Sequence, residues 1–111
     1  MKTHLKITSL GFSFLLAGMA SQAAPVVENW ENHCAKCHGA DGKGDTKTGR
    51  KLKLVDYTDA AVQAKMTDAE MTKAIVEGVT EGGKERMKAF KDELTKEEID
   101  AIVGYIRKFK A

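Results

Sequence analysis

Proline and cysteine are scarce in this chain of 111 residues, which contains one Pro and two Cys, and aromatic residues make up only 6%. Two cysteines three positions apart can close only a tiny disulfide loop, which restrains the unfolded chain very little. No uninterrupted apolar run reaches the roughly 20 residues that a membrane-spanning helix requires. A disulfide framework and a spanning helix are therefore both excluded as organising features.

The beginning of the chain has the pattern of an export signal. Three basic residues lie within the first six positions, residues 7–20 carry no charge, and Ser21 and Ala23 are small residues where a signal peptidase reads. A membrane anchor would need a longer apolar stretch. We therefore predict that residues 1–23 are a cleaved signal peptide, that residues 24–111 form the mature domain, and that this domain is periplasmic.

Removing the signal changes the charge of the protein. The whole chain has 18 basic and 16 acidic residues, and residues 1–23 contain Lys2 and Lys6 but no acid. The mature domain would thus be formally neutral, which gives no indication of nucleic-acid binding. No second apolar run follows, so we expect no stable membrane insertion. A domain of this size is only marginally stable by itself and usually needs disulfides, a structural metal or another bound group.

Helical spacing predicts a first helix from Pro25 to His38. The residues that share its apolar face are Val27, Trp30, Cys34, Cys37 and His38. Pro25 suits the first helical turn, where its missing N–H group is not needed.

Two further helices are indicated by capping boxes, in which Thr is followed three residues later by Glu. Thr67 and Glu70 begin the second helix, which Gly82-Gly83 would end, and Thr95 and Glu98 begin the third. Residues 39–53 form a glycine-rich, charged stretch with no helical period, and residues 59–65 could form a short helical turn. Because no strand-like alternation is visible, we predict an all-α domain.

The central motif is Cys34-Ala35-Lys36-Cys37-His38. The pattern C-x-x-C-H is typical of covalent haem attachment, because two thiols can reach two vinyl groups and the following imidazole can reach the iron. A dithiol redox pair would be expected beside a βαβ pattern and would give His38 no role. A zinc site needs about four protein ligands, and His33 is the only other histidine of the mature domain.

A second axial ligand to the iron is expected if the protein only transfers electrons. The candidates are the three methionines of the mature domain, Met66, Met71 and Met87. Met66 and Met71 flank a helix start and fit a core role. Met87 stands alone among charged residues, where packing gives no reason for it, so we predict that Met87 binds the iron.

These motifs resemble those of the class I cytochrome c family in its short bacterial, single-haem form. The resemblance covers nearly the whole mature domain and rests on residues 34–39, 41–44, 83–90 and 105–106. It implies three to five helices wrapped around one covalent haem c. It also implies that the first and last helices cross near Trp30 and Tyr105 and that the iron has His–Met ligation.

The chain departs from the family pattern at three points. Val26 occupies a position that usually holds Gly, and no Pro lies between Gly39 and Tyr57 to supply a carbonyl that orients the haem-binding imidazole. The ligand methionine is often followed by Pro, whereas Lys88 follows Met87. We therefore expect a wider helix crossing, another carbonyl beside His38, and a looser loop at Met87.

With His38 and Met87 both bound, the iron would have no open position. The sequence therefore predicts a soluble one-electron carrier that is not an enzyme. Two alternatives remain open: a haem-based sensor or ligand-binding module, in which Met87 leaves the iron, and a thiol–disulfide enzyme without haem.

Charged residues are unevenly distributed along the mature domain. Residues 43–53 carry a local charge of +4, residues 84–91 a charge of +3, and residues 92–100 a charge of −4. We expect the first two segments to flank the haem edge and to attract a redox partner protein with an acidic docking patch. Arg50 is a candidate partner for a haem propionate, and we expect the carrier to be a monomer.

Overall fold

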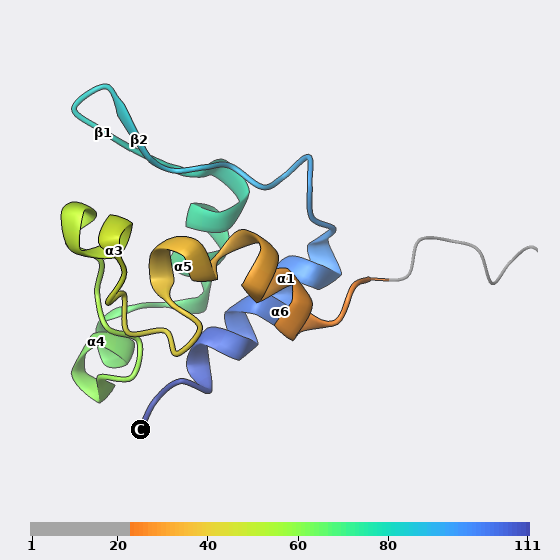
Figure 1. Cartoon of the computed structure of the whole chain (residues 1–111). Helices are drawn as coiled ribbons and strands as arrows, with labels where there is room; N and C mark the ends of the chain where they lie inside the picture. The colour runs from red at the N-terminus through yellow and green to blue at the C-terminus, as the bar shows by residue number, and fades with distance from the viewer. Residues whose placement is uncertain (1–22) are drawn as a thin grey trace, which may run out of the picture.

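The computed structural model describes residues 23–111, which form six helices and one short β-hairpin (Figure 1). The elements are α1 (Val26–His33), α2 (Ala35–His38), α3 (Lys47–Leu52), α4 (Ala60–Lys65), α5 (Asp68–Glu77), β1 (Val79–Glu81), β2 (Lys84–Met87) and α6 (Lys96–Arg107). The all-α prediction is confirmed in its essentials, with a two-stranded hairpin added. The expected signal peptide lies outside the described residues, apart from Ala23.

The first predicted helix is divided into two. Cys34 has backbone angles of φ −119° and ψ −40° and separates α1 from α2. The prediction that Val27 faces the core is wrong, since 49% of Val27 is exposed. The buried residue on that turn is Asn29, whose side-chain amide donates to Glu98 Oε2 at 2.6 Å. The face that α1 buries therefore includes a residue whose partner lies far along the chain, which its apolar spacing does not indicate.

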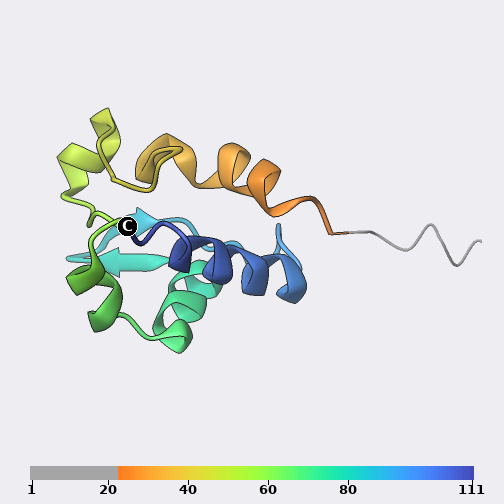
Figure 2. The ribbon, with the colours of Figure 1, turned by 90° about the horizontal axis from the view of Figure 1, so that it is seen from below.

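Helices α1 and α6 pack against each other, and α5 packs against α6 (Figure 2). The ring centroids of Trp30 and Tyr105 lie 5.5 Å apart where α1 meets α6, as the family resemblance implies. The buried apolar residues are Trp30, Cys34, Met71, Ile75, Phe90, Leu94, Ile99, Ile102, Val103 and Ile106.

Thr95 begins α6 with the complete capping box that the sequence predicts: its side chain accepts from Glu98 N, and Glu98 accepts from Thr95 N. Thr67 caps α5 by accepting from Glu70 N at 3.1 Å. Here, however, the Thr67 hydroxyl donates to the Glu70 carboxylate at 2.9 Å. This bond replaces the second bond of a capping box, in which the Glu70 side chain would accept from the backbone N–H of Thr67.

Helix α5 ends at Gly78, and the prediction that it continues to Gly82-Gly83 is wrong. Gly78 has φ +73° and ψ −177°, a conformation that is essentially confined to glycine. Gly82 and Gly83 form the turn between β1 and β2, with φ +57° and +76°. Positive φ at both central residues is the requirement of a tight two-residue hairpin turn, which explains the glycine pair.

Helix α3 lies inside the stretch for which the sequence predicted no helix. Thr46 caps it by accepting from Gly49 N at 2.8 Å. Only Gly49 is buried in this helix, so there is no apolar stripe by which the sequence could indicate it. The short turn predicted over residues 59–65 is present as α4.

Gln63 and Arg107 connect α4 to α6. The buried amide of Gln63 donates to the carbonyls of Tyr57 and Ile106, both at 2.8 Å. Arg107 Nη1 donates to Gln63 Oε1 at 3.0 Å, and Arg107 Nη2 donates to the carbonyl of Met66 at 2.6 Å. None of the helices in residues 23–111 is long and apolar enough to cross a membrane.

Candidate haem site

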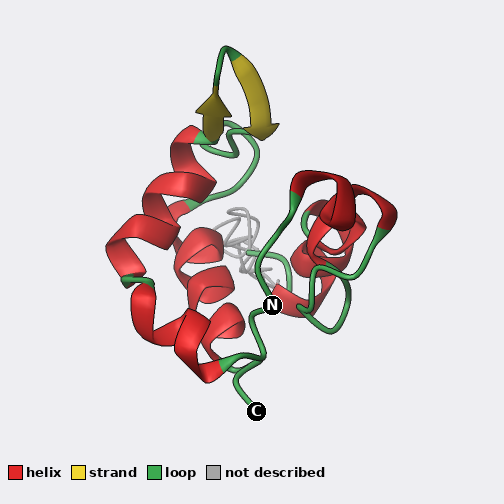
Figure 3. Cartoon of the chain, turned by 90° about the vertical axis from the view of Figure 1, so that its left-hand side faces the viewer, coloured by secondary structure: helices red, strands yellow, loops and turns green. Residues whose placement is uncertain are grey.

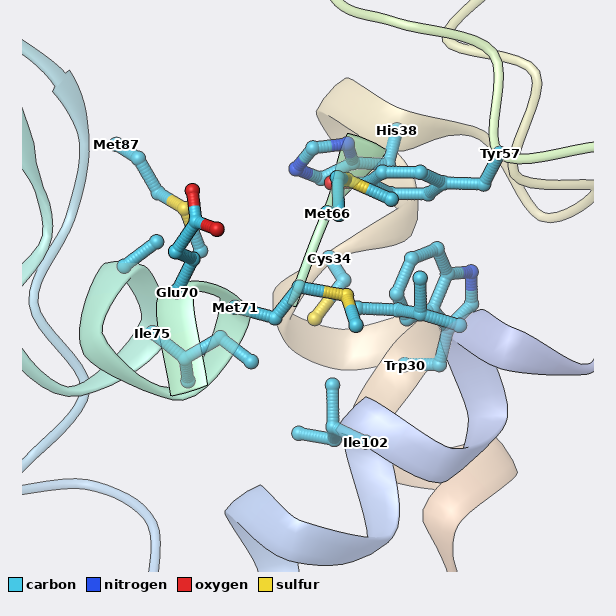
Figure 4. A pocket seen from close by; sticks show the side chains of 12 residues that line it. Trp30, Cys34, His38, Tyr57, Met66, Glu70, Met71, Ile75, Met87 and Ile102 are labelled. Carbon is cyan, nitrogen blue, oxygen red and sulfur yellow. The ribbon is translucent and has the colours of Figure 1, made fainter. Parts of the chain in front are cut away.

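An apolar cavity lies between α2, α5, α6 and the hairpin (Figure 4). It has two adjoining parts, of about 150 Å³ and about 440 Å³. Both parts are lined by Cys34, His38, Tyr57, Ala74 and Met87. The smaller part extends inwards to Met71 and Ile102, whereas the larger part extends towards charged residues such as Arg86 and Lys88.

Both motif cysteines are free thiols at this cavity, since Cys34 and Cys37 form no disulfide with each other. Cys34 is only 8% exposed. Burial, and secondarily the nearby Cys37, raises the pKa of the Cys34 thiol to about 11. A dithiol redox enzyme depends on a thiolate with a lowered pKa, so this environment is unfavourable for the thiol–disulfide alternative.

His38 presents its imidazole to the same cavity. Burial lowers the pKa of His38, which favours the neutral imidazole that binds metals. The ring lies close to two aromatic neighbours: its centroid is 5.2 Å from that of Tyr57 and 5.9 Å from that of Trp30. Among the described residues, the buried His38 Nδ1 has no hydrogen-bond partner, so the structure does not supply the orienting carbonyl that we expected.

The segment after His38 is fixed beneath the motif by backbone contacts. Thr46 Oγ1 donates to the carbonyl of Cys37 at 2.6 Å, and the indole of Trp30 donates to the carbonyl of Gly39 at 2.9 Å. A Cβ at Gly49 would lie 2.1 Å from the Gly44 carbonyl oxygen and 2.6 Å from that of Cys37. The glycines of this loop therefore allow the chain to pack closely against the residues of the motif.

Met87 lies at the end of β2 and reaches the cavity from a different element than His38 (Figure 4). Met66 and Met71 line only the smaller part, and Met71 belongs to the buried core. Met87 is thus the one of these three methionines that lines both parts of the cavity.

Three residues were missed or misjudged as members of the site from the sequence. Arg50, the candidate for a propionate, pairs with Asp45 at the surface and lines neither part of the cavity. Arg86 lines the larger part instead. Tyr57 was expected to pack on the core and was given no role at the haem, although it is the only aromatic residue between His38 and Phe90.

The donor set of this cavity fits a haem. Two adjacent thiols, a neutral imidazole and a thioether surround an apolar space, which suits covalent attachment and axial ligation of a flat apolar group. Within residues 23–111, no three side chains of His, Cys, Asp or Glu come together to hold a bare metal ion, as a zinc site would require.

The packing of α1 against α6 and a C-x-x-C-H motif at an apolar cavity define a c-type cytochrome. The family model described as Cytochrome c matches residues 23–110, and the chain belongs to this family. The site therefore takes one covalently attached haem c, and Cys34 and Cys37 fit its attachment motif.

Individual relatives agree with this assignment. A cytochrome c6-like protein of Nostoc sp. (strain PCC 7120 / SAG 25.82 / UTEX 2576) is 28% identical over 114 residues, which span 96% of this chain and 92% of the relative. The solved structure of the KustC0563 c-type cytochrome is 36% identical, with a TM-score of 0.71, and the match covers 79% of this chain and all of that chain. A solved mutant of that same cytochrome, with Phe in place of one Tyr, is 37% identical, with a TM-score of 0.68, and the match covers 78% of this chain and all of that chain.

Proposed function

We propose that this cytochrome is a one-electron carrier of the periplasm whose haem iron is held by His38 and Met87. The observation that supports this proposal best is that both side chains line the same two-part apolar cavity from separate elements. When bound, the haem supplies an iron that alternates between the ferrous and the ferric state. Export to the periplasm rests on the composition of residues 1–23.

The role of His38 follows from its surroundings. Burial keeps the imidazole neutral, and the rings of Trp30 and Tyr57 restrict its rotation. The hydrogen bond from Trp30 to Gly39 ties the residue after His38 to α1. These contacts would hold the imidazole of His38 in one orientation in both oxidation states of the iron. Little structural reorganisation should therefore accompany electron transfer.

Met87 would occupy the other axial position. With both positions taken by protein side chains, no substrate can reach the metal directly, so the chain is expected to transfer electrons and not to catalyse a reaction. A thioether ligand raises the reduction potential relative to two imidazoles. The apolar lining raises it further, because a site of low dielectric constant disfavours the additional charge of the ferric state.

The mouth of the larger cavity suggests where a redox partner docks. Lys53, Arg86 and Lys88 line this part, and Val55 beside them is 47% exposed. An exposed apolar residue beside three cations and one carboxylate, Glu81, suits a partner with an acidic patch. Lys88 pairs with Glu93 and Arg50 with Asp45, so the other cations of residues 43–53 and 84–91 would carry most of the attraction.

Docking of this kind has a clear dependence on ionic strength. The rate of electron transfer to an acidic partner should fall as salt is added, because exposed charges are screened over about 10 Å at 0.1 M. A rate that does not change with salt would contradict the acidic patch on the partner. Sedimentation of the holoprotein would test the expectation of a monomer.

The alternative of a haem sensor or ligand-binding module is favoured by one feature. Met87 is followed by Lys88 and lies on a hairpin that projects from the helices (Figure 3). Such a ligand could be displaced by a small molecule that binds the iron.

Ligand substitution separates the two functions. The ferric holoprotein should show the weak red absorption band that marks iron–methionine bonding in this family, and Met87→Leu should abolish it. Met66→Leu and Met71→Leu are matched controls, because these methionines line only one part of the cavity, and both should retain the band. A wild-type protein without the band, or a Met87→Leu variant that retains it, would contradict His–Met ligation. The haem count and the cleavage site would follow from a pyridine haemochrome spectrum and an intact mass.

A further inference from the structure

The hairpin that carries Met87 has few attachments to the rest of the domain. It projects from the helices in two views, and an added Cβ at Gly82 or Gly83 in its turn would meet nothing within 4 Å (Figures 1 and 3). Within residues 23–111 its strands pair only with each other, and the register is irregular between Val79 and Thr80. The position of Met87 therefore depends on contacts near the base of the hairpin.

One side chain supplies such a contact. Arg86 Nη2 donates a hydrogen bond to the carbonyl of Leu52, at 2.5 Å, across a separation of 34 residues. Among the described residues, this is the one side-chain hydrogen bond that joins residues 79–87 to another element. Arg86 Nε also lies 3.9 Å from the carboxylate of Glu81 on the neighbouring strand, which orients the guanidinium.

The acceptor is well suited to a cation. Leu52 is the last residue of α3, and the carbonyls of a final helical turn have no partner within their own helix. Lys53, which follows in the left-handed conformation at φ 57°, turns the chain so that residues 52–55 line the larger part of the cavity. Arg86 thus connects the two chain segments that face each other across the mouth of the cavity.

We infer that Arg86 is a positioning residue that holds Met87 in place for the iron. The inference rests on the proposed function, in which Met87 is the axial ligand. Arg86 immediately precedes Met87, and both line the larger part of the cavity. The bond to Leu52 fixes the strand end from which the sulfur extends, and it compensates for the Lys88 that follows where the family often has Pro. Without the bond, the hairpin is freer to swing outwards and the iron–sulfur bond opens more often.

The test measures how easily Met87 is displaced. Imidazole is a suitable probe because the form that binds iron is neutral, so at one fixed pH its binding to the ferric iron responds little to the removal of a surface charge. We expect Arg86→Gln to bind imidazole about tenfold more tightly, which corresponds to about 1.4 kcal/mol. Its methionine band should also disappear at a lower temperature than in the wild type, while the helices melt later.

The control is Lys84→Gln, which removes one positive charge from an exposed position of the same hairpin, where the side chain makes no hydrogen bond or ion pair with the described residues. It should bind imidazole like the wild type. Arg86→Lys keeps the charge but loses the planar donor group, so its affinity for imidazole should lie between those of the wild type and Arg86→Gln. It would replace Arg86→Gln if that variant failed to fold.

Equal affinities in Arg86→Gln and the wild type, or equal increases in Arg86→Gln and Lys84→Gln, would overturn the positioning role while leaving Met87 as the ligand. Loss of the helices together with the methionine band would also overturn it, because Arg86 would then support the whole fold. A wild-type protein that lacks the band would overturn the ligand assignment itself, and the positioning role with it.

Discussion

The phenol ring of Tyr57 lies stacked on the imidazole of His38, with centroids 5.2 Å apart and ring planes 22° apart. Two hydrogen bonds hold the backbone of Tyr57: its carbonyl accepts from the buried amide of Gln63, and its N–H donates to the carbonyl of Gly42 at 2.9 Å. The imidazole that would bind the iron is therefore held by packing, while its Nδ1 has no acceptor among the described residues.

Removal of the Tyr57 ring should destabilise the holoprotein and loosen His38. We expect Tyr57→Ala to lower the free energy of unfolding by about 1–3 kcal/mol, because a partly buried ring and its stacking contact are lost. Tyr57→Phe keeps the ring, so its free energy of unfolding should stay near that of the wild type. Denaturant unfolding followed by the Soret band would measure both, and equal losses in the two variants would contradict a role for stacking.

Gly78 controls the approach of the Met87 strand. A Cβ there would lie 2.6 Å from the carbonyl oxygen of Met87, and the backbone has a positive φ of 73°. Gly78→Ala should therefore displace the strand and weaken the methionine band of the ferric protein. Gly82→Ala is the matched control, since Gly82 also has a positive φ but an added Cβ meets nothing within 4 Å. Equal bands in the two variants would show that crowding at Met87 is unimportant.

Glu98 links three segments and should make stability depend on pH. Hydrogen bonds from the Thr95 backbone and then from the Asn29 amide lower the pKa of Glu98 below its usual value of 4.5. A lowered folded pKa contributes stability that is complete above the unfolded pKa and is lost as pH falls through the folded pKa. The stability difference between the wild type and Glu98→Gln should thus be largest near neutral pH and shrink below about pH 4.5.

Chemical denaturation at a series of pH values would measure this difference. Glu97→Gln serves as the control, because Glu97 is exposed in the same first turn of α6. A gap between wild type and Glu98→Gln that widens in acid would contradict the assignment.

Gly104 should be the simplest site at which to stabilise the domain. It lies exposed within α6, and an added Cβ would meet nothing within 4 Å. Gly104→Ala should raise the free energy of unfolding by about 0.5–1 kcal/mol, because glycine loses the most backbone freedom in a helix. Thermal unfolding of the holoprotein checks this, and a lower midpoint would indicate a contact at Gly104 that the fold does not explain.

The features that the sequence predicted correctly are those with a short-range signal. The C-x-x-C-H motif spans five residues, and each Thr-to-Glu cap spans four, so their geometry follows from one helical turn. The contact of α1 and α6 at Trp30 and Tyr105 was available only through the family resemblance.

The features that were missed depend on distant partners or on exposed chain. Asn29 is buried because Glu98, far along the chain, accepts from it, and no local pattern indicates this. The hairpin projects from the helices, so its strands show no alternation between apolar and polar residues, although Gly82-Gly83 is a recognised turn signal. Arg86 was counted as one cation in a charged segment, because its acceptor is a backbone carbonyl 34 residues away.

The burial of Cys34 also bears on how the protein is assembled. Cys34 is only 8% exposed and lines the inner part of the cavity together with Trp30 and Ile102, so the folded domain leaves little room for a catalyst that joins its sulfur to a vinyl carbon. We therefore expect thioether formation to precede the packing of α1 against α6, which would then enclose the linkage. Maturation and folding of this cytochrome would then be consecutive steps, in an order set by the burial of one residue.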